Sequence, residues 1–301
     1  MQQNIELVNK LLIVSNDAGG AEVLSAWGEF HQNQFDISYW LTGPAASIFS
    51  RKISKLNFYE HGLDKLGTFD QIITSTSWST LHEKQVIQKA KHLKIPVAVY
   101  LDNWMGYAQR FELNNELVLP DEIWVGDEYA KHLADLVFPN LRIILVPNLY
   151  MQGLITEIEN LQHEERSIHP RILYVTEPTS VVALSKYGQE NYFGYTEFTA
   201  LNNFLAYIQH QSIQYEKIRI RPHPSECADK YSRYLQDAHH VIEISNTNAL
   251  AEDCAWADIV AGCQSMVMAI AVNAGKQVIS CLPPGVESYL PYPQIVKIFQ
   301  S

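Results

Sequence analysis

The stretch Leu11-Leu12-Ile13-Val14-Ser15-Asn16-Asp17-Ala18-Gly19-Gly20 decides how the chain begins to fold. Its first five residues form a short, mostly apolar run, typical of a strand that is covered on both faces. The run stops at a glycine turn, and a helical segment from about Ala21 to Phe30 follows. A strand, a glycine turn and a helix in this order predict the start of an α/β domain. The sequence contains neither G-x-G-x-x-G at this turn nor G-x-x-x-x-G-K-[ST], so no dinucleotide fingerprint or P-loop is predicted.

The same alternation continues through both halves of the 301-residue chain. Further strands are expected at 37–41, 71–75, 97–101, 122–125, 143–146, 171–175, 217–220, 241–244, 258–262 and 277–281, and helices at 80–93, 128–137, 196–210, 248–255 and 264–275. Strands separated by helices predict parallel sheets with helices on both faces. The length allows two such domains. We expect an α/β class of two Rossmann-like, doubly wound domains facing a cleft, with residues 1–150 and 171–301 joined by a linker at 151–170 that begins with a short helix.

Composition and charge narrow the class of protein. Hydrophobic residues make up 47% of the chain and charged residues 18%, which is typical of a globular protein. The formal net charge of -11 argues against nucleic acid or an anionic membrane as a general partner. The four cysteines show no C-x-x-C spacing, which indicates free thiols in a reducing compartment. With no evident signal peptide and no apolar segment long enough to span a bilayer, we expect a cytoplasmic protein, with a peripheral position at the inner membrane left open.

In parallel α/β sheets, ligands bind beyond the carboxyl ends of the strands. Asp102 ends the apolar segment 96–101, and a group of polar and aromatic side chains follows it: Asn103, Trp104, Tyr107 and Arg110. Aromatic rings stack on the apolar faces of sugars, and a carboxylate can take a hydroxyl proton. This pattern predicts an acceptor subsite, to which Trp78 is added, with a packed loop tryptophan as the alternative role for Trp78. The alternative is that Asp102 caps the next helix and the aromatic residues belong to the core.

Asp17 is the second candidate for a general base. It lies in the glycine-rich turn after the first strand, where a backbone can approach a ligand closely. The alternative role for Asp17 is to cap the first helix. Asp127 is expected to cap the helix at 128–137. The choice between Asp102 and Asp17 stays open at this point.

The second half contains Arg221-Pro222-His223-Pro224-Ser225-Glu226 directly after the strand at 217–220. The two prolines stiffen the backbone on either side of His223. A histidine held in this way can donate a hydrogen bond to a phosphate oxygen or protonate it as it leaves, and Arg221 adds a permanent charge. The alternative is a proline turn with no ligand.

Other strand ends of the second half add further donor-binding candidates. The pair Gln264-Ser265 opens the helix at 264–275, and a helix N-terminus attracts anions. Ser265 can also be an ordinary cap, and the two roles are compatible. The strand ends at 171–175 and 241–244 contribute Thr176, Glu177, Thr179 and Asn246, for which a hydrophilic loop is the alternative.

The strand ending in Arg-Pro-His-Pro, and the later Gly-x-x-Ser at a helix start followed by Gly-Lys, resemble the GT-B glycosyltransferases. The similarity is to bacterial capsule and lipopolysaccharide enzymes with an HP motif, which include sialyltransferases and Kdo transferases that use CMP-activated sugars. The resemblance implies that His223 contacts the donor phosphate and helps the nucleotide leave, and that Ser265 holds the same phosphate. CDP-glycerol transferases and UDP-sugar 2-epimerases share similar patterns in their second domains.

The resemblance implies a glycosyltransferase of surface polysaccharide synthesis. Its partners would be a nucleotide-sugar donor in the second domain and a glycan or glycolipid acceptor in the first. Because no Asp-x-Asp is present to carry a divalent ion, neither a metal nor a cofactor is expected. The alternatives are a UDP-sugar 2-epimerase or hydrolase, and a non-catalytic nucleotide- or glycan-binding protein of the same fold. The residues fix neither the donor nucleotide nor the oligomeric state.

Overall fold

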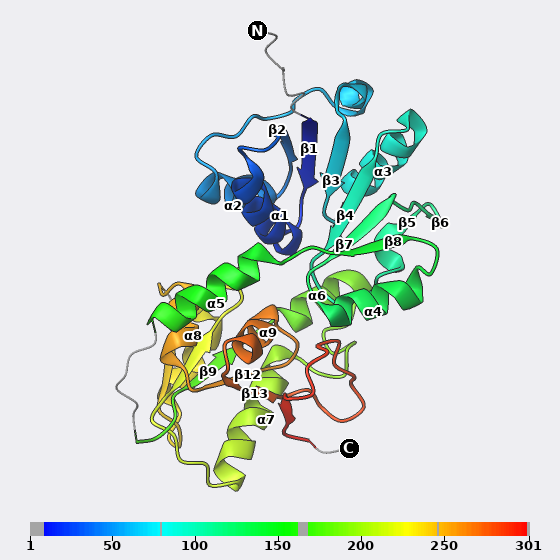
Figure 1. Ribbon diagram of the computed structural model, residues 1–301. Coiled ribbons are helices and arrows are strands. Elements are labelled where there is room, and N and C mark those ends of the chain that lie inside the picture. Colours follow the sequence, from blue (N-terminus) through cyan, green and yellow to red (C-terminus); the bar gives the residue numbers. More distant parts are fainter. Residues whose placement is uncertain (1–8, 79, 162–167, 246, 300–301) are drawn as a thin grey trace. The chain divides into compact units, whose positions relative to one another are not determined.

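The computed structural model describes residues 9–78, 80–161, 168–245 and 247–299 (Figure 1). The chain divides into two compact units, Met1–Gln152 and Gly153–Ser301. Each unit is built on its own six-stranded sheet, and every strand pair in the two sheets is parallel. The expected α/β class with two doubly wound parallel sheets is therefore confirmed.

The sheet of unit 1 has the strand order β2-β1-β3-β4-β7-β8. Its strands are β1 (Lys10–Ser15), β2 (Asp36–Leu41), β3 (Gln71–Thr74), β4 (Val97–Leu101), β7 (Glu122–Val125) and β8 (Arg142–Leu145). The helices are α1 (Ala18–His31), α2 (Ala45–Lys52), α3 (His82–Leu93) and α4 (Glu128–Val137), and α5 (Leu149–Leu161) begins in this unit. The unit also has 3-10 turns at Leu63–Thr68 and Gln109–Phe111 and a small hairpin of β5 (Glu112–Leu113) and β6 (Glu116–Leu117). Helices α1 and α2 pack together on one side of the sheet, and α3 lies on the other (Figure 1).

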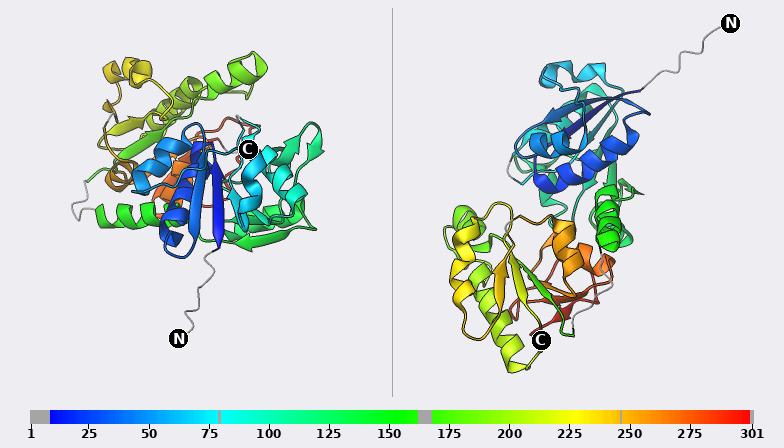
Figure 2. Two further views of the ribbon diagram at one scale, coloured as in Figure 1. Left: turned by 90° about the horizontal axis from the view of Figure 1, so that it is seen from above. Right: turned by 90° about the vertical axis from the view of Figure 1, so that its left-hand side faces the viewer.

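The sheet of unit 2 has the strand order β11-β10-β9-β12-β13-β14. Its strands are β9 (Ile172–Val175), β10 (Ile218–Arg221), β11 (Ile242–Ile244), β12 (Ile259–Gly262), β13 (Gln277–Ser280) and β14 (Val296–Lys297). The helices are α6 (Thr179–Tyr187), α7 (Glu197–His210), α8 (Leu250–Trp256) and α9 (Met266–Asn273), with a 3-10 segment η3 at Ala228–Gln236. Figure 2 shows this unit from two further sides.

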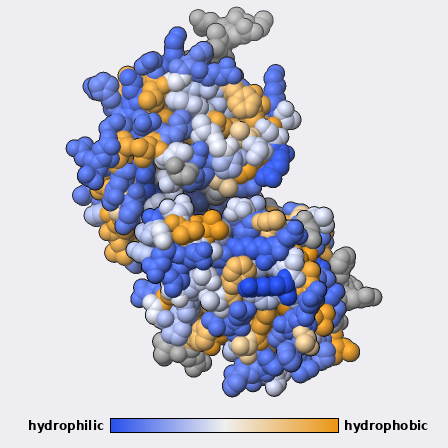
Figure 3. Space-filling model, turned by 180° about the vertical axis from the view of Figure 1, so that it is seen from behind, coloured by the Kyte–Doolittle hydropathy of each residue, from blue (hydrophilic) through white to orange (hydrophobic). Residues whose placement is uncertain are grey.

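Burial explains why the apolar runs form central strands. All five residues of β4 are buried, as are all four of β9 and of β12. Such strands are covered on both faces, which is the environment that continuous apolar runs require. At the outer surface, hydrophilic residues predominate on the face of the molecule seen in Figure 3.

Two features differ from the sequence-based expectation. Helix α6 begins at Thr179, where a polar loop was expected, and β14 follows the strand that was predicted to be the last. The boundary between the units falls inside α5, which runs to Leu161 and corresponds to the short helix expected in the first part of 151–170. Both missed elements are hard to see in sequence: α6 exposes Val181 and Leu184, and β14 has two residues.

No helix among the described residues combines the length and the apolar character that a crossing of the bilayer requires.

Candidate active site

In unit 2, three strand ends meet where the order of the sheet reverses. Strand β9 pairs with β10 on one side and with β12 on the other. At such a switch point the two connections leave the sheet toward opposite faces, so ligands bind between them. Thr176 and Glu177 follow β9, His223 follows β10 and Gln264 follows β12. The structure thus brings together four of the residues that the sequence singles out for donor binding.

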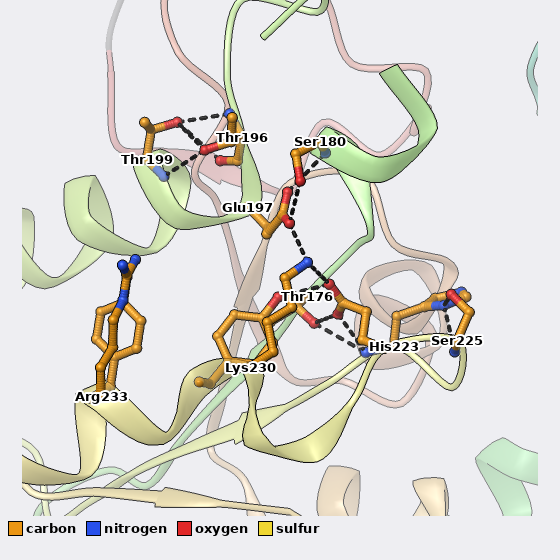
Figure 4. A network of polar contacts seen from close by, with 12 residues as sticks. Thr176, Ser180, Thr196, Glu197, Thr199, His223, Ser225, Lys230 and Arg233 are labelled. Carbon is orange, nitrogen blue, oxygen red and sulfur yellow. Dashed lines mark hydrogen bonds and ion pairs between the residues drawn. The ribbon is translucent and has the colours of Figure 1, made fainter. Parts of the chain in front are cut away.

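His223 is fixed through its backbone and through one ring nitrogen. Its backbone N–H donates to Oγ1 of Thr176 at 3.1 Å and to Oε2 of Glu226 at 3.0 Å. In the ring, Nδ1 accepts the backbone N–H of Ser225 at 3.2 Å and lies 2.8 Å from the Ser225 hydroxyl (Figure 4). A ring nitrogen that accepts an N–H carries no proton, so the neutral imidazole holds its proton on Nε2. The residue is exposed, and it can offer this Nε2–H to a ligand.

The charge state of His223 follows from its surroundings. Although His223 has an exposed edge, the protein around its ring displaces water from the charged form and lowers the pKa of His223, and the Glu226 carboxylate opposes this effect. The imidazole is therefore neutral at pH 7. An anion bound at Nε2 would raise the pKa of the ring, which turns a hydrogen-bond donor into a proton donor.

Glu226 holds the turn that carries His223. Its carboxylate accepts hydrogen bonds from the hydroxyls of Thr176 and Tyr231, the latter at 3.0 Å, and forms an ion pair with Lys230 at 2.7 Å. Burial alone would raise the pKa of Glu226, but the bonds from Lys230 and Thr176 outweigh it and lower the pKa. Sequence reasoning did not assign Glu226 or Lys230 a role, although their i, i+4 spacing is a signal for such a pair.

Lys230 extends this network to the start of α7. Its ammonium also pairs with Glu197, whose carboxylate accepts the hydroxyl of Ser180 at 2.6 Å and its backbone N–H at 2.9 Å (Figure 4). Glu197 is 3% exposed, so its charge is compensated inside the protein. The network therefore ties η3, α6 and α7 to the strand end at His223.

The start of α9 has the expected N-cap, and the carboxylate of Glu177 also binds there. The Ser265 hydroxyl accepts the backbone N–H of Val267 at 3.3 Å, so Ser265 is the N-cap. The carboxylate of Glu177 accepts the backbone N–H of Gln264 at 2.6 Å. The side-chain oxygen of Gln264 in turn accepts the N–H of Tyr289 at 3.0 Å. The carboxylate of Glu177 thus lies at the helix start where the sequence predicts a phosphate-binding site.

Arg221 does not join His223 in these contacts. Its guanidinium donates to Asp253 on α8 and to the backbone carbonyl of Asn248 at 3.0 Å. Arg219 lies two residues earlier on the same face of β10 and donates to the same carboxylate at 3.0 Å. The structure thus places Arg221 in a buried ionic cluster around Asp253. Asn246 lies outside the described residues.

Thr179 starts α6 and lines a small pocket at the end of β9. The pocket is lined by Tyr174, Val175, Thr176, Glu177, Thr179, Glu197, Ala200 and Cys263. Only 7% of Thr179 is exposed, so this residue lies in the wall of the pocket and not on the open surface.

In unit 1, Asp17 lies at the corresponding switch point. Strand β1 pairs with β2 and β3, and Asp17 follows β1. One carboxylate oxygen accepts from the amide of Asn16 and from the hydroxyl of Ser77, both at 2.8 Å. The other accepts the backbone N–H of Trp78 at 2.8 Å. Both oxygens are therefore used to hold the loop after β3, and no side-chain cap of α1 is formed.

Asp102 lies beside the same turn, so the structure brings the two candidate bases together. Its Oδ1 accepts from Arg110 at 2.9 Å, and its Oδ2 has a longer contact of 3.4 Å with the amide of Asn103. Oδ2 also faces the backbone of Gly19, where a Cβ atom would lie 2.1 Å away. The carboxylate is thus oriented by an arginine and fits only against a glycine.

Arg110 is 1% exposed and orients its neighbours from inside the protein. Besides Asp102, it donates to the hydroxyl of Thr76 at 2.6 Å, to Oδ1 of Asn103 at 2.7 Å and to the carbonyl of Met105 at 2.9 Å. Its guanidinium is therefore directed at the protein and not at the surface.

The aromatic candidates for the acceptor are mostly buried. Trp104 and Tyr107 are 6% and 3% exposed, and the indole of Trp104 donates to Asp127 at 3.1 Å. Asp127 also caps α4, as predicted, by accepting the N–H of Ala130 at 2.7 Å. Trp78 is 39% exposed and its ring lies 5.0 Å from the guanidinium of Arg110. Of these three aromatic side chains, Trp78 is the one placed to meet a ligand.

The described part of the chain holds no group of three or more His, Cys, Asp or Glu side chains arranged to bind a metal ion.

The similarity of this chain to known proteins is found in its fold. No protein-family model matches the chain, and no curated protein matches it in sequence. Among solved structures, UDP-GlcNAc 2-epimerase from Neisseria meningitidis, bound to UDP-GlcNAc, has a TM-score of 0.57 at 14% identity and covers 90% of this chain and 82% of its own. The UDP-GlcNAc 2-epimerase from Methanocaldococcus jannaschii has a TM-score of 0.57 at 13% identity, with coverages of 90% and 83%.

A glycosyltransferase also appears among these structures. A UDP-glucosyltransferase from Polygonum tinctorium, capable of glucosylating indoxyl, has a TM-score of 0.54 at 10% identity and covers 92% of this chain and 80% of its own. Identities this low carry information on the fold alone. They confirm the GT-B-like fold, whose structural neighbours are enzymes that act on nucleotide sugars.

Proposed function

We propose that this protein is a GT-B enzyme that transfers a sugar from a nucleotide donor to a hydroxyl group of a glycan or glycolipid. The observation that supports this most is the Nε2–H of a rigidly held, exposed His223 at the switch point of unit 2. A donor phosphate placed there would accept this hydrogen bond. The N-terminus of α9 lies on the other side of β9 and would attract the same anion. Unit 2 is thus the proposed donor unit, and unit 1 the proposed acceptor unit.

His223 and the start of α9 would stabilise the charge of the departing nucleotide. As the bond between the sugar and the phosphate oxygen breaks, negative charge develops on that oxygen, and a fixed N–H donor stabilises it. Since the sequence has no Asp-x-Asp, we infer that these groups act without a divalent ion. A CMP-activated acid sugar and a UDP-sugar are both donors that this chemistry can serve.

We assign the general base to Asp102. In transfer, an acceptor oxygen forms the new bond to the anomeric carbon and loses its proton to a carboxylate. Both oxygens of Asp17 accept short hydrogen bonds, whereas Oδ2 of Asp102 has only a 3.4 Å contact among the described residues. Oδ2 is therefore the better placed atom to accept the proton.

The variant Gly19→Ala tests this assignment. Its methyl group would lie 2.1 Å from Oδ2 of Asp102 and must displace the carboxylate. Because a misplacement of about 1 Å can cost on the order of 100-fold in rate, we expect turnover to fall about 100-fold. The helix content, measured by circular dichroism, should not fall, since alanine favours helices more than glycine does.

The matched control is Gly28→Ala in the same helix, where the nearest atoms to a Cβ would lie at an ordinary 3.4 Å. We expect Gly28→Ala to keep turnover within about threefold, because it stays clear of both strand ends. A Gly19→Ala variant as active as the wild type would show that Asp102 is not the base.

A second candidate function is epimerisation at C2 of a UDP-sugar, with release of free sugar as a related outcome. It is favoured by the structural neighbours, several of which are UDP-GlcNAc 2-epimerases. Such an enzyme needs no acceptor. The need for an acceptor therefore separates the two activities.

The test is to incubate the protein with UDP-GlcNAc or with a CMP-activated acid sugar, each with and without a mixture of glycan acceptors. Transfer predicts consumption of the donor only when an acceptor is present. Epimerised or free sugar formed at an undiminished rate without acceptor would overturn the transferase proposal. Donor binding without any turnover would identify a non-catalytic binding protein.

A further inference from the structure

Glu177 occupies the position that the proposed function gives to the donor phosphate. Its Oε1 accepts the N–H of Gln264 at 2.6 Å, and the N–H of Ser265 also bonds to this carboxylate. These are the N–H groups just before α9, which the same proposal assigns to a phosphate oxygen. A carboxylate and a phosphate are both anions that accept N–H bonds, so they repel each other at this site.

Among the described residues, the groups that surround Glu177 do not supply a free positive charge. Lys230 in η3 forms ion pairs with Glu226 and Glu197. The negative charge of Glu226 disfavours the ionised form of Glu177 and so raises the pKa of Glu177. His223 after β10 is neutral at pH 7 for the reasons given above. The remaining titratable neighbours are phenols and thiols whose pKa values are raised by burial and which stay uncharged: Tyr174, Tyr195, Cys263 and Cys281.

The ionised and the protonated forms of the Glu177 carboxyl group are close in free energy at neutral pH. Burial raises the pKa of Glu177 to about 7, although the N–H bonds from Gln264 and Ser265 favour the ionised form. A second anion at the same place would favour the protonated form further. The protonated carboxyl has an O–H, which can donate to a phosphate oxygen instead of competing with it.

We propose that Glu177 takes up one proton when the nucleotide sugar binds, so that this residue makes donor affinity depend on pH. This inference rests on the proposed donor site. Below about pH 7, Glu177 is already largely protonated, and binding needs no further proton. Above about pH 7, each bound donor requires a proton from solution, so affinity should fall about tenfold per pH unit.

Calorimetry of donor binding between pH 6 and 9 tests this inference on the full chain. UDP-GlcNAc and a CMP-activated acid sugar are suitable probes, because their esterified phosphates do not titrate in this range. Each titration is repeated in two buffers of different ionisation enthalpy, which gives the number of protons taken up. The proteins compared are the wild type, Glu177→Gln, and Glu190→Gln as a matched control at an exposed position.

For the wild type and for Glu190→Gln, we expect affinity to weaken about 50-fold from pH 7 to pH 9, with uptake of about one proton at pH 9. Glu177→Gln keeps the size of the side chain and cannot ionise. Between pH 7 and pH 9 its affinity should therefore fall about 50-fold less than that of the wild type, and at pH 9 it should take up about one proton fewer. Any contribution from His223 is present in all three proteins and cancels in the comparison.

Two results would overturn the inference while leaving the proposed donor site intact. One is a wild-type affinity that is independent of pH between 7 and 9, without proton uptake. The other is weaker binding by Glu177→Gln at every pH, which would show that the ionised carboxylate contacts the donor directly. If neither protein binds a nucleotide sugar even at pH 6, the proposed function itself fails, and this inference fails with it.

Discussion

Replacing His223 by alanine is expected to lower the turnover of the nucleotide sugar by about 100- to 1,000-fold. The variant removes the Nε2–H that would bind the donor phosphate and the proton that the leaving nucleotide would receive. It should not unfold the protein, because the side chain is exposed and the bonds from its backbone N–H to Thr176 and Glu226 remain. Initial rates at saturating donor measure the effect, with circular dichroism to check the fold.

The matched control is His239→Ala, an exposed histidine in the same unit. It should keep full turnover, because it lies after η3 and away from the switch point. A His223→Ala variant with turnover within about threefold of the wild type would contradict the role assigned to this strand end. The variant Ser225→Ala separates the two contacts at Nδ1 of His223. It removes the hydroxyl beside Nδ1 but keeps the hydrogen bond from the backbone N–H of residue 225.

Asp253→Asn is expected to destabilise unit 2 by about 3 kcal/mol. Asp253 is fully buried, and its carboxylate holds Arg219, Arg221 and the amide of Asn248. Removing one partner of a buried ion pair costs about 3–5 kcal/mol, because the other charge is left without compensation. The lower end applies here, since both arginines retain some contact with solvent.

Hydrogen exchange resolved by mass spectrometry measures this loss in β9 and β10, with the strands of unit 1 as an internal reference. Asp229→Asn is the matched control, because Asp229 is exposed. Protection of β10 that is unchanged in Asp253→Asn would show that the cluster does not stabilise the sheet.

The same variant predicts a dependence on pH. Burial alone would raise the pKa of Asp253, but the bonds from Ser245, Asn248 and Arg221 outweigh it and lower the pKa. A lowered pKa in the folded state stabilises the fold above the pKa of the unfolded chain, which is about 3.9 for aspartate. This stabilisation is lost as the pH falls toward the folded-state pKa, so the difference between wild type and Asp253→Asn should shrink below about pH 4.

The elements that sequence reasoning predicted well are those that local chemistry determines. Strand β4 was predicted with its observed ends because its five apolar residues form one run that stops at Asp102. Helix α4 was predicted with its observed ends because Asp127 is a cap residue directly before an amphipathic segment. The helix start at Ser265 was predicted in the same way, from a cap residue directly before an apolar segment.

The direction of side chains was harder to predict, because it depends on partners far away in the chain. Arg221 precedes His223 by two residues, yet it faces Asp253, which lies 32 residues further on. The alternation along β10 contains part of this information, since it places Arg219 and Arg221 on one face. The bond between Glu177 and Gln264 joins residues 87 positions apart and has no local signal.

In unit 1, the sequence left two roles open for the aromatic side chains after β4, a sugar subsite or part of the core, and the structure shows Trp104 and Tyr107 buried. Trp104, Tyr107 and Arg110 follow β4 as a compact polar and aromatic group, which is typical of a sugar subsite. The structure packs all three inside the protein, and Arg110 holds Asp102 in place. Composition alone does not distinguish a surface that binds sugar from a buried group that supports a carboxylate.

The measurement that tests the central proposal most directly is thermal unfolding of the wild type and of His223→Ala with a panel of UDP-, CMP-, CDP- and GDP-sugars. A ligand that binds only the folded state stabilises it, by about 2.7 kcal/mol at 100 times its dissociation constant. The proposed donor site at His223 predicts that at least one nucleotide sugar raises the melting temperature of the wild type by several degrees, and that His223→Ala shows a clearly smaller rise. A panel in which no nucleotide sugar shifts the wild type, or in which the shift is the same in both proteins, would contradict it.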